Sequence, residues 1–335
     1  MRDTSQQEIR AITLAFEEFS GTDEDEVPLA ARVAEHYGAR HVIRRVSEQE
    51  FRNDLPAILE AMDQPSIDGV NTWFVAKAAR EVGLKVALSG LGGDELLAGY
   101  PSFVDLPRWR RRFGPLAAIP GLGRLARLAL RNIAPWIGRA RPKVLGLFDY
   151  AQSWAGVYLL RRGLFLPHEL GQVMDPDLAH EGLRRLQPLR RLTASLLPDP
   201  GSLVARVSAL ESSYYLRNQL LRDTDWAGMA HSVEIRVPLV DLTLLKSLAP
   251  AIGGLLPGAG KAALAKAPAI PLPDEIVTRA KTGFGVPTEA WMDAAAGAPR
   301  LPTGRIRETR GLASRRWSRL VLAGPGFAPP KVQVA

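Results

Sequence analysis

The chain has 335 residues, enough for about two domains and a substantial hydrophobic core. It contains no cysteine, which excludes disulfide bonds, thiolate metal sites and a cysteine nucleophile on this polypeptide. Lysine and arginine number 43 against 35 aspartate and glutamate, and the formal net charge of +8 favours anionic ligands. With 46% hydrophobic and 23% charged residues, the composition predicts a folded protein and not a disordered one.

The first hundred residues predict strands that alternate with helices. The predicted strands cover residues 11–16, 41–46 and 84–88, and the last of these is expected to be buried. The predicted helices cover residues 27–37, 48–62 and 72–82, with Gly38 and Gly83 ending the first and the last. Strands separated by helices predict the α/β class with a doubly wound parallel sheet.

The middle of the chain differs from this pattern. It is rich in arginine, leucine and proline and shows no strand alternation, so we predict a mostly helical second lobe. Arginines cluster at Arg108–Arg112 and Arg184–Arg191. These clusters lack interleaved aromatic residues apart from Trp109 and accompany no known docking motif. We therefore predict a solvated basic face and no nucleic-acid partner.

Targeting and membrane signals are weak. The polar, acid-containing start Met1–Arg10 is unlike a secretory signal, which predicts a cytoplasmic protein. The most apolar stretch, residues 115–138, is interrupted by arginines and prolines, so we predict no membrane span. Two interpretations of this stretch remain: a helix packed on its own domain, or an amphipathic helix that lies on a surface.

The most informative segment is Lys85–Tyr100, which reads KVALSGLGGDELLAGY. A strand runs into Ser89 and Gly90, and ligands of parallel sheets gather beyond the carboxyl ends of the strands. The glycines allow close approach of the backbone to an anion, and Asp94 could hold Mg²⁺ that neutralises phosphate charge. In the alternative interpretation the glycines only join a strand to a helix, and Asp94 complements the helix dipole.

Two later segments are also candidates for a site. The stretch 221–241 mixes Asp225, Glu234 and Arg236 with many apolar residues, which predicts either structural ion pairs or the wall of a site. The glycine-rich stretch 279–287 carries Lys281, a flexible cation that either reaches a ligand or is simply solvated.

In their order and spacing, the three segments resemble the synthetase domain of the asparagine synthase family of glutamine-dependent amidotransferases. The similarity covers roughly residues 10 to 295. Three signatures carry it: Leu-Ser-Gly-x-Gly-x-Asp-Glu-x-x-x-Gly-Tyr, Met-Ala-x-x-x-Glu-x-Arg-x-Pro-x-x-Asp, and Lys-x-Gly-Phe-x-x-Pro.

The resemblance implies an ATP-dependent carbon–nitrogen ligase that also uses Mg²⁺. Such a domain adenylates a carboxylate, typically the side chain of aspartate, and ammonia derived from glutamine then displaces AMP to give asparagine, with pyrophosphate as the other product. The implied fold is the adenine nucleotide alpha hydrolase-like type, also called HUP or PP-loop ATPase.

The resemblance also implies roles for individual residues. The positions of Ser89 and Gly90 contact AMP, and the position of Leu14 lines the nucleotide pocket. Asp94 matches the aspartate that binds magnesium pyrophosphate. Lys281 matches the catalytic lysine that stabilises charge developing at the phosphate and acyl centre.

The sequence departs from the family pattern at the position of Leu91, where asparagine-forming members usually carry glutamate. Leucine cannot accept a proton. Either another acid supplies that function, or the chain belongs to a branch that amidates a different carboxylate, such as one in a cell-surface glycan or peptide pathway.

A second departure is the lack of the family's Ser-Gly-Gly-x-Asp-Ser pyrophosphate loop, its preceding strand and the glutaminase domain with its N-terminal cysteine. We therefore expect a doubly wound sheet without its first strand, and an N-terminally truncated synthetase. The missing parts would belong to a longer product or to a partner chain. The competing hypothesis is a non-catalytic remnant.

From these observations we divide the chain into four regions. Residues 1–105 are an incomplete nucleotide-binding α/β portion, and residues 106–200 are an arginine-rich helical lobe. Residues 201–300 complete the synthetase domain, and residues 301–335 are a peripheral tail.

Overall fold

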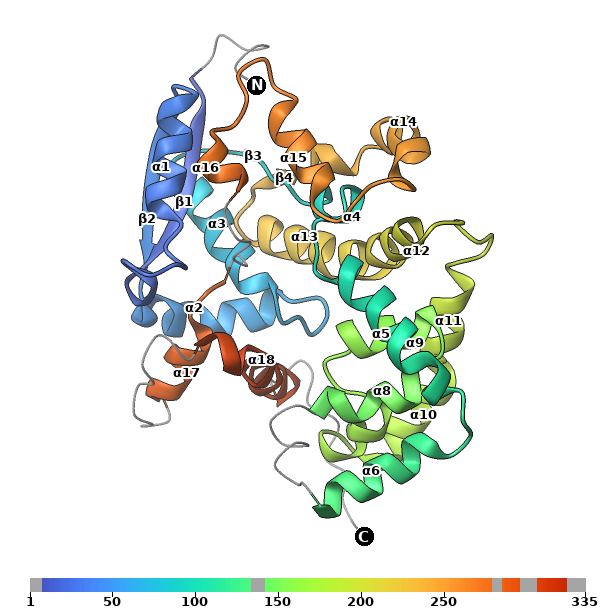
Figure 1. Ribbon diagram of the computed structural model, residues 1–335. Helices are drawn as coiled ribbons and strands as arrows, with labels where there is room; N and C mark the ends of the chain where they lie inside the picture. The colour runs from blue at the N-terminus through green and yellow to red at the C-terminus, as the bar shows by residue number, and fades with distance from the viewer. Residues whose placement is uncertain (1–7, 134–141, 279–284, 296–305, 324–335) are drawn as a thin grey trace. The chain divides into compact units, whose positions relative to one another are not determined.

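The computed structural model describes residues 8–133, 142–278, 285–295 and 306–323 (Figure 1). The chain divides into two compact units. The first comprises Met1–Ser89, Gln219–Pro238 and Leu264–Ala335, and the second comprises Gly90–Asn218 and Leu239–Ala263. The first unit contains strands and helices, which confirms the predicted α/β class.

The elements predicted in the first hundred residues are all present, with ends that differ by at most about three residues. Gly38 and Gly83, which follow two of the helices, have φ angles of +60° and +76° and so adopt the left-handed conformation that commonly ends a helix. The first unit consists of β1 (Arg10–Phe16), η1 (Glu17–Phe19), α1 (Val27–His36), β2 (Arg40–Val46), α2 (Glu48–Ala61), α3 (Gly69–Glu81), β3 (Val86–Leu88), α13 (Leu221–Ala230), β4 (Glu234–Arg236), α16 (Asp274–Val277), α17 (Thr288–Ala295) and α18 (Ile306–Ala323).

The four strands of the described residues form two separate parallel pairs. β1 pairs with β2 from Arg10 opposite Arg40 to Phe16 opposite Val46, and β3 pairs with β4. In the described part of the chain, β1 and β3 each keep one edge without a strand partner, although both pack on α3. The small sheets therefore do not confirm the predicted single doubly wound sheet.

The burial predicted for the third strand is wrong. Only Val86–Leu88 is extended, and the side chains of Val86 and Leu88 are 39% and 49% exposed. A three-residue strand with one paired edge covers little surface, so apolar sequence alone does not bury it.

The core of the first unit is rich in aromatic residues. Phe51, Phe74 and Trp73 from α2 and α3 pack there with Trp291 of α17. Trp317 of α18 is also buried, and its indole N–H donates to the carbonyl of Ser66 at 3.0 Å. Part of the region predicted as a peripheral tail thus completes the core.

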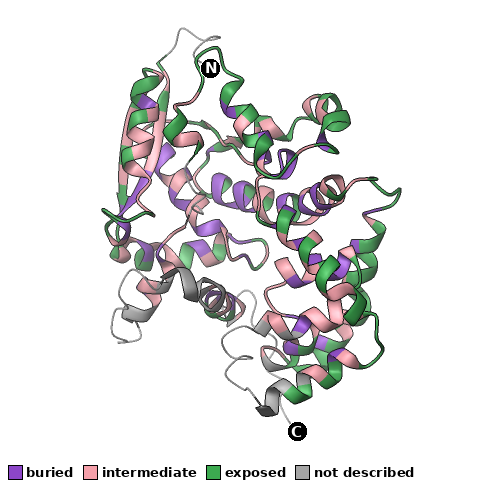
Figure 2. Ribbon diagram, in the orientation of Figure 1, coloured by how far each residue is buried: buried purple, intermediate pink, exposed green. Residues whose placement is uncertain are grey.

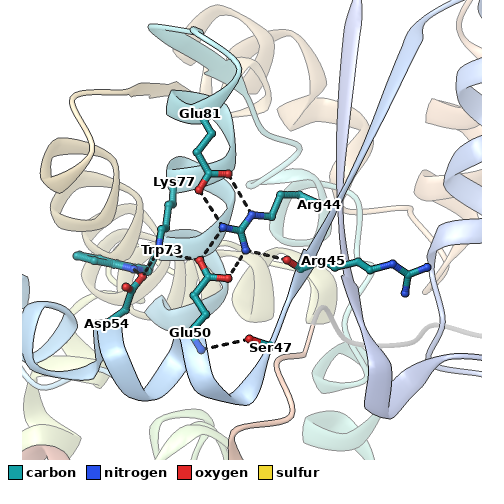
Figure 3. Close-up of polar contacts among 8 residues, drawn as sticks. All are labelled: Arg44, Arg45, Ser47, Glu50, Asp54, Trp73, Lys77 and Glu81. Carbon is teal, nitrogen blue, oxygen red and sulfur yellow. Dashed lines mark hydrogen bonds and ion pairs between the residues drawn. The ribbon is translucent and has the colours of Figure 1, made fainter.

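An ion-pair network ties α2 and α3 to β2 (Figure 3). The guanidinium of Arg44 on β2 donates to Glu50 of α2, with 2.6 Å between Nη2 and Oε1, and to Glu81 of α3, with 2.8 Å between Nη2 and Oε1. The hydrogen bonds that Arg44 donates to both carboxylates raise the pKa of Arg44 above its already high usual value. One side chain therefore connects three elements.

Lys77 of α3 extends this network. Its ammonium group lies 2.7 Å from Glu50 Oε1 and 2.7 Å from Asp54 Oδ2. Asp54 also accepts a hydrogen bond from the indole N–H of Trp73 at 2.9 Å. Burial opposes the charge on Lys77, but its two carboxylate partners outweigh that cost, and the net pKa is raised.

All the regular secondary-structure elements described in the second unit are helices. Its first core joins α5 and α9 through Phe103, Leu106 and Val157, and Leu210 of α12 packs against them. The elements are α4 (Gly93–Leu96), α5 (Ser102–Ala117), α6 (Leu122–Ile133), η2 (Pro142–Gly146), α8 (Leu147–Tyr150), α9 (Trp154–Arg162), η3 (Pro167–Gln172), α10 (Pro176–Leu186), α11 (Pro188–Ala194), α12 (Leu203–Leu210), η5 (Pro238–Val240) at the boundary, α14 (Leu242–Ile252), and most of the π-helix η4 (Glu211–Leu220) and of α15 (Ala259–Lys266).

Among the described residues, no helix combines the length and hydropathy that crossing a bilayer requires.

Replacement of Arg44 tests the ion-pair network. Arg44→Met leaves Glu50 and Glu81 with fewer counter-charges, and we expect a loss of about 2 kcal/mol in the free energy of unfolding measured in urea. Arg52→Met is the matched control, because within the described ranges Arg52 forms a single ion pair, the helical i,i+4 pair with Glu48, and its loss should cost about 0.5 kcal/mol or less. Equal losses in the two variants would contradict the network's structural role.

Asp223 of α13 predicts a pH dependence of stability. It is buried, accepts hydrogen bonds from Ser66 at 2.8 Å and Trp226 at 2.9 Å, and burial raises its pKa from 3.8 to about 6. The folded state therefore favours the protonated carboxyl of Asp223, and the stability that this protonation contributes is complete below pH 3.8 and is lost as the pH rises through 6. Asp223→Asn should gain stability relative to the wild type across this window, by at most about 3 kcal/mol, measured by urea unfolding at several pH values. Parallel pH profiles would refute the assignment.

Candidate functional site

Pairing of β3 with β4 brings the first two sequence motifs together within the first unit. Val86 lies opposite Glu234, and Leu88 lies opposite Arg236. The backbone N–H of Ser89 continues this ladder by donating to the carbonyl of Arg236 at 2.9 Å. Ser89 therefore marks the carboxyl end of a parallel strand, the place where α/β proteins bind ligands.

Three charged residues of the second motif that were candidates for a site wall, Asp225, Glu234 and Arg236, lie on the surface. Glu234 and Arg236 are each 60% exposed and pair with each other, with 2.9 Å between Oε1 and Nε. Hydrogen bonding by Arg236 lowers the pKa of Glu234. Asp225 on α13 is exposed as well. The burial that made these residues candidates for a site wall is absent, and a surface ion pair accounts for two of them.

Two other predicted residues have different outcomes. Leu14 is buried in the core of the first unit, in the middle of β1 and opposite Arg44 of β2. Lys281 lies outside the described residues. Contact of either residue with nucleotide stays a prediction.

The glycine-rich turn that begins the second unit has a restricted geometry. Gly92 has a φ angle of +90°, and a Cβ atom there would lie 2.6 Å from Val240 Cγ2. The N–H of Gly93 donates to the carbonyl of Gly90 at 3.3 Å, which closes the turn before α4. A left-handed conformation and a close neighbour together require glycine at position 92.

Asp94 in the first turn of α4 pairs with a cation that sequence reasoning missed. Nζ of Lys261 on α15 lies 2.8 Å from Asp94 Oδ1. Gly99 makes room for this pair, because a Cβ atom there would lie 1.9 Å from Asp94 Oδ1 and 2.8 Å from Lys261 Cδ. The only sequence signal for Lys261 was its place directly after Gly258-Ala-Gly260.

The next residue, Glu95, points into the second unit. It is buried, and its Oε1 accepts a hydrogen bond from the Tyr100 hydroxyl at 2.9 Å. Its backbone carbonyl accepts from Ser208 of α12 at 2.8 Å. Burial raises the pKa of Glu95, and Oε2 has no hydrogen-bond partner within the described residues. Glu95 thus anchors α4 while Asp94 faces Lys261.

Arg162 extends this anchor to the π-helix η4. Its guanidinium carbon lies 3.5 Å from the centre of the Tyr215 ring and 4.8 Å from that of Tyr100. Its Nε donates to Oε2 of the fully buried Glu211 at 2.9 Å. Burial opposes the charge on Arg162, but Glu211 outweighs it and the net pKa is raised. The ten-residue length of η4 is unusual, since π-helices are mostly single turns and often accompany functional sites.

The described residues include no group of three or more His, Cys, Asp or Glu side chains that could hold a metal ion. Asp94 offers one hard carboxylate ligand of the kind that Mg²⁺ prefers. A carboxylate of this kind suits a metal that arrives with phosphate oxygens and water, and it does not suit a permanent protein-bound metal.

A parallel strand that ends in a glycine-rich turn, followed by a carboxylate paired with an ammonium group, is typical of nucleotide-binding α/β proteins. Residues 1–301 match the family model described as asparagine synthase, and the chain belongs to this family. Its domain is of the PP-loop ATPase type.

Individual relatives agree with this assignment. A protein named "Putative asparagine synthetase (glutamine-hydrolyzing)" from Mycobacterium tuberculosis is 31% identical over 288 residues, which are 80% of this chain and 40% of the relative. "Asparagine synthetase (glutamine-hydrolyzing) 1" from Bacillus subtilis is 26% identical over 280 residues, which are 80% of this chain and 41% of that protein. The chain thus spans about two fifths of the length of the curated relatives it matches.

The contact of Gly99 with the Asp94–Lys261 pair can be tested by substitution. We expect Gly99→Ala to lower the free energy of unfolding by about 1–3 kcal/mol, because the new methyl group overlaps both side chains. Adding Asp94→Ala removes the closest overlap and should recover part of the loss in a double-mutant cycle. Gly182→Ala in α10 is the control. A Cβ atom at this position would meet no neighbouring side chain within 4 Å, so the substitution should be neutral or slightly stabilising. Additive losses in the cycle would contradict the contact.

Proposed function

We propose that this chain is the synthetase part of an ATP-dependent amidotransferase. It would adenylate a carboxylate, most simply the side chain of aspartate, and amidate it with ammonia derived from glutamine. The products would be asparagine, AMP and pyrophosphate. Membership of the asparagine synthase family supports this proposal, and we place the reaction in the cytoplasm.

The observation that carries the proposal is the turn from Ser89 to Asp94 with its paired lysine. Backbone N–H groups of a glycine-rich turn suit an anion, and Ser89 and Gly90 would contact AMP. Lys261 adds a positive charge 2.8 Å from Asp94, where pyrophosphate would leave. A cation there stabilises the negative charge that develops on the departing phosphates.

Asp94 would hold Mg²⁺ together with the phosphates. The ion supplies charge neutralisation on the phosphate oxygens when it is bound. Asp94 is already held by Gly99 and Lys261, and Glu95 fixes the short helix behind it. Lys281 would bring a second ammonium group to the acyl centre, and Leu14 would line the adenine side of the pocket.

Two alternatives follow from particular residues. Leu91 stands where asparagine-forming members usually carry glutamate, so a different carboxylate, such as one in a cell-surface glycan or peptide pathway, is the second candidate substrate. The open edges of β1 and β3 favour a third hypothesis, in which the chain is a non-catalytic remnant or a subunit that needs a partner.

A partner or a further segment would supply the pyrophosphate loop and the glutaminase. We propose that such a segment adds a strand between β1 and β3 and so completes a doubly wound parallel sheet. Both open edges lie on strands that pack on the same helix, α3, which supports this arrangement.

Exchange of labelled pyrophosphate into ATP tests the proposal directly. With Mg²⁺ and aspartate, we expect exchange by the full chain that Lys281→Met abolishes, because the lysine would stabilise the adenylation transition state. Lys266→Met is the control, since Lys266 is an exposed lysine on the same stretch of chain and should leave exchange unchanged.

Each outcome of this assay separates the hypotheses. Exchange that requires another carboxylate would assign the second substrate class. Exchange that appears only after addition of a segment encoded in the upstream DNA would identify a subunit. No exchange under any of these conditions would leave a non-catalytic remnant and refute the ligase.

A further inference from the structure

The positive charge of the chain is concentrated in one stretch of the second unit. Residues 106–133 contain seven arginines and no lysine, aspartate or glutamate. This stretch, which we call the basic segment, therefore carries +7, compared with a net charge of +8 for the whole chain. It covers most of α5 and all of α6.

The arginines of α5 are exposed and lack acidic partners. Within the described residues, those between Arg108 and Arg112 form no ion pair with a carboxylate. By contrast, Arg184 and Arg185 on α10 both pair with Glu181, at 2.7 Å and 2.5 Å. A local carboxylate therefore compensates part of the charge of the second cluster, whereas within the described residues none pairs with the first.

The basic segment also turns large aliphatic side chains to solvent. Leu125 and Leu128 on α6 are 65% and 53% exposed, while Gly123 faces the packed side of the helix, where a Cβ atom would meet Asp149 of α8. Leu116 at the end of α5 and Ile119 in the next turn are exposed as well. Figure 2 shows exposed residues along α6.

Aliphatic and basic groups share the same helical faces. On α5, Arg112 and Leu116 are four residues apart and therefore neighbours on the helix surface. On α6, exposed Arg124 lies beside Leu125 and Leu128. Arginines that flank leucines in this way are typical of helices that lie in a membrane interface.

We propose that the basic segment docks the chain on an anionic lipid bilayer. Leu125 and Leu128 enter the interface, and the arginines contact headgroup phosphates. Charge complementarity identifies an anionic surface. The exposed leucines favour lipid over nucleic acid, because a phosphodiester backbone neutralises arginine but gives leucine no apolar medium. This surface function is independent of the ligase activity.

Vesicle flotation with the full chain tests the proposal. We expect binding to phosphatidylcholine vesicles with about one third phosphatidylglycerol, little binding to pure phosphatidylcholine, and weaker binding in about 0.5 M KCl. Leu125→Glu with Leu128→Glu should reduce partitioning about tenfold or more, because both insertion points become charged.

The matched control is Leu178→Glu with Leu186→Glu. These two leucines on α10 are 51% and 50% exposed but lie outside the basic segment, so binding should be unchanged. Circular dichroism checks that all variants remain folded. If the glutamate pair unfolds the chain, Leu125→Ser with Leu128→Ser carries the same test.

Three results would overturn the proposal. They are equal binding to neutral and anionic vesicles, equal binding by the α6 and α10 variants, and tighter binding to double-stranded DNA than to anionic vesicles. The last would assign the basic segment to nucleic acid.

Discussion

The guanidinium of Arg44 holds together three elements of the first unit, β2, α2 and α3. Because it bonds carboxylates on both α2 and α3, it fixes two helices against one strand, and Lys77 closes the network from the other side. The position of α3 matters beyond this contact, since β1 and β3 both pack on it. The ion-pair network therefore fixes the helix against which the strand that leads to Ser89 packs.

The second unit holds the Asp94–Lys261 ion pair directly after the tight turn at Gly92. The four-residue helix α4 cannot position Asp94 by itself, because so short a helix is unstable without tertiary contacts. Glu95 supplies such contacts: it is buried in the helical core and accepts a hydrogen bond from Tyr100. Arg162 stacks on the Tyr100 ring and is itself paired with Glu211. The two adjacent acids therefore have different contacts: Glu95 anchors the helix, and Asp94 pairs with Lys261.

Local patterns predicted the first hundred residues well, because helix periodicity and the glycines at 38 and 83 are encoded in a few neighbouring positions. The sequence also identified the turn from Ser89 to Asp94. It could not reveal Lys261, whose partner is far along the chain, nor the burial of Trp317, which depends on a tertiary contact with Ser66. It misjudged β3, since apolar residues look alike in a buried strand and in a short strand that is paired on one edge among the described residues. The roles of Leu14 and Lys281 stay predictions.

Within the part of the chain that the structure describes, β1 and β3 each have one edge without a strand partner, and this has a practical consequence. Each presents a row of backbone donors and acceptors, and natural proteins normally shield such rows with charge, proline, bulges or a covering element. Arg40, Arg44 and Arg45 place positive charge on β2, the partner of β1, whereas β3 has two exposed aliphatic side chains beside its edge. The isolated polypeptide is therefore prone to strand-to-strand association between its own copies, and solutions of it should become less homogeneous as concentration rises.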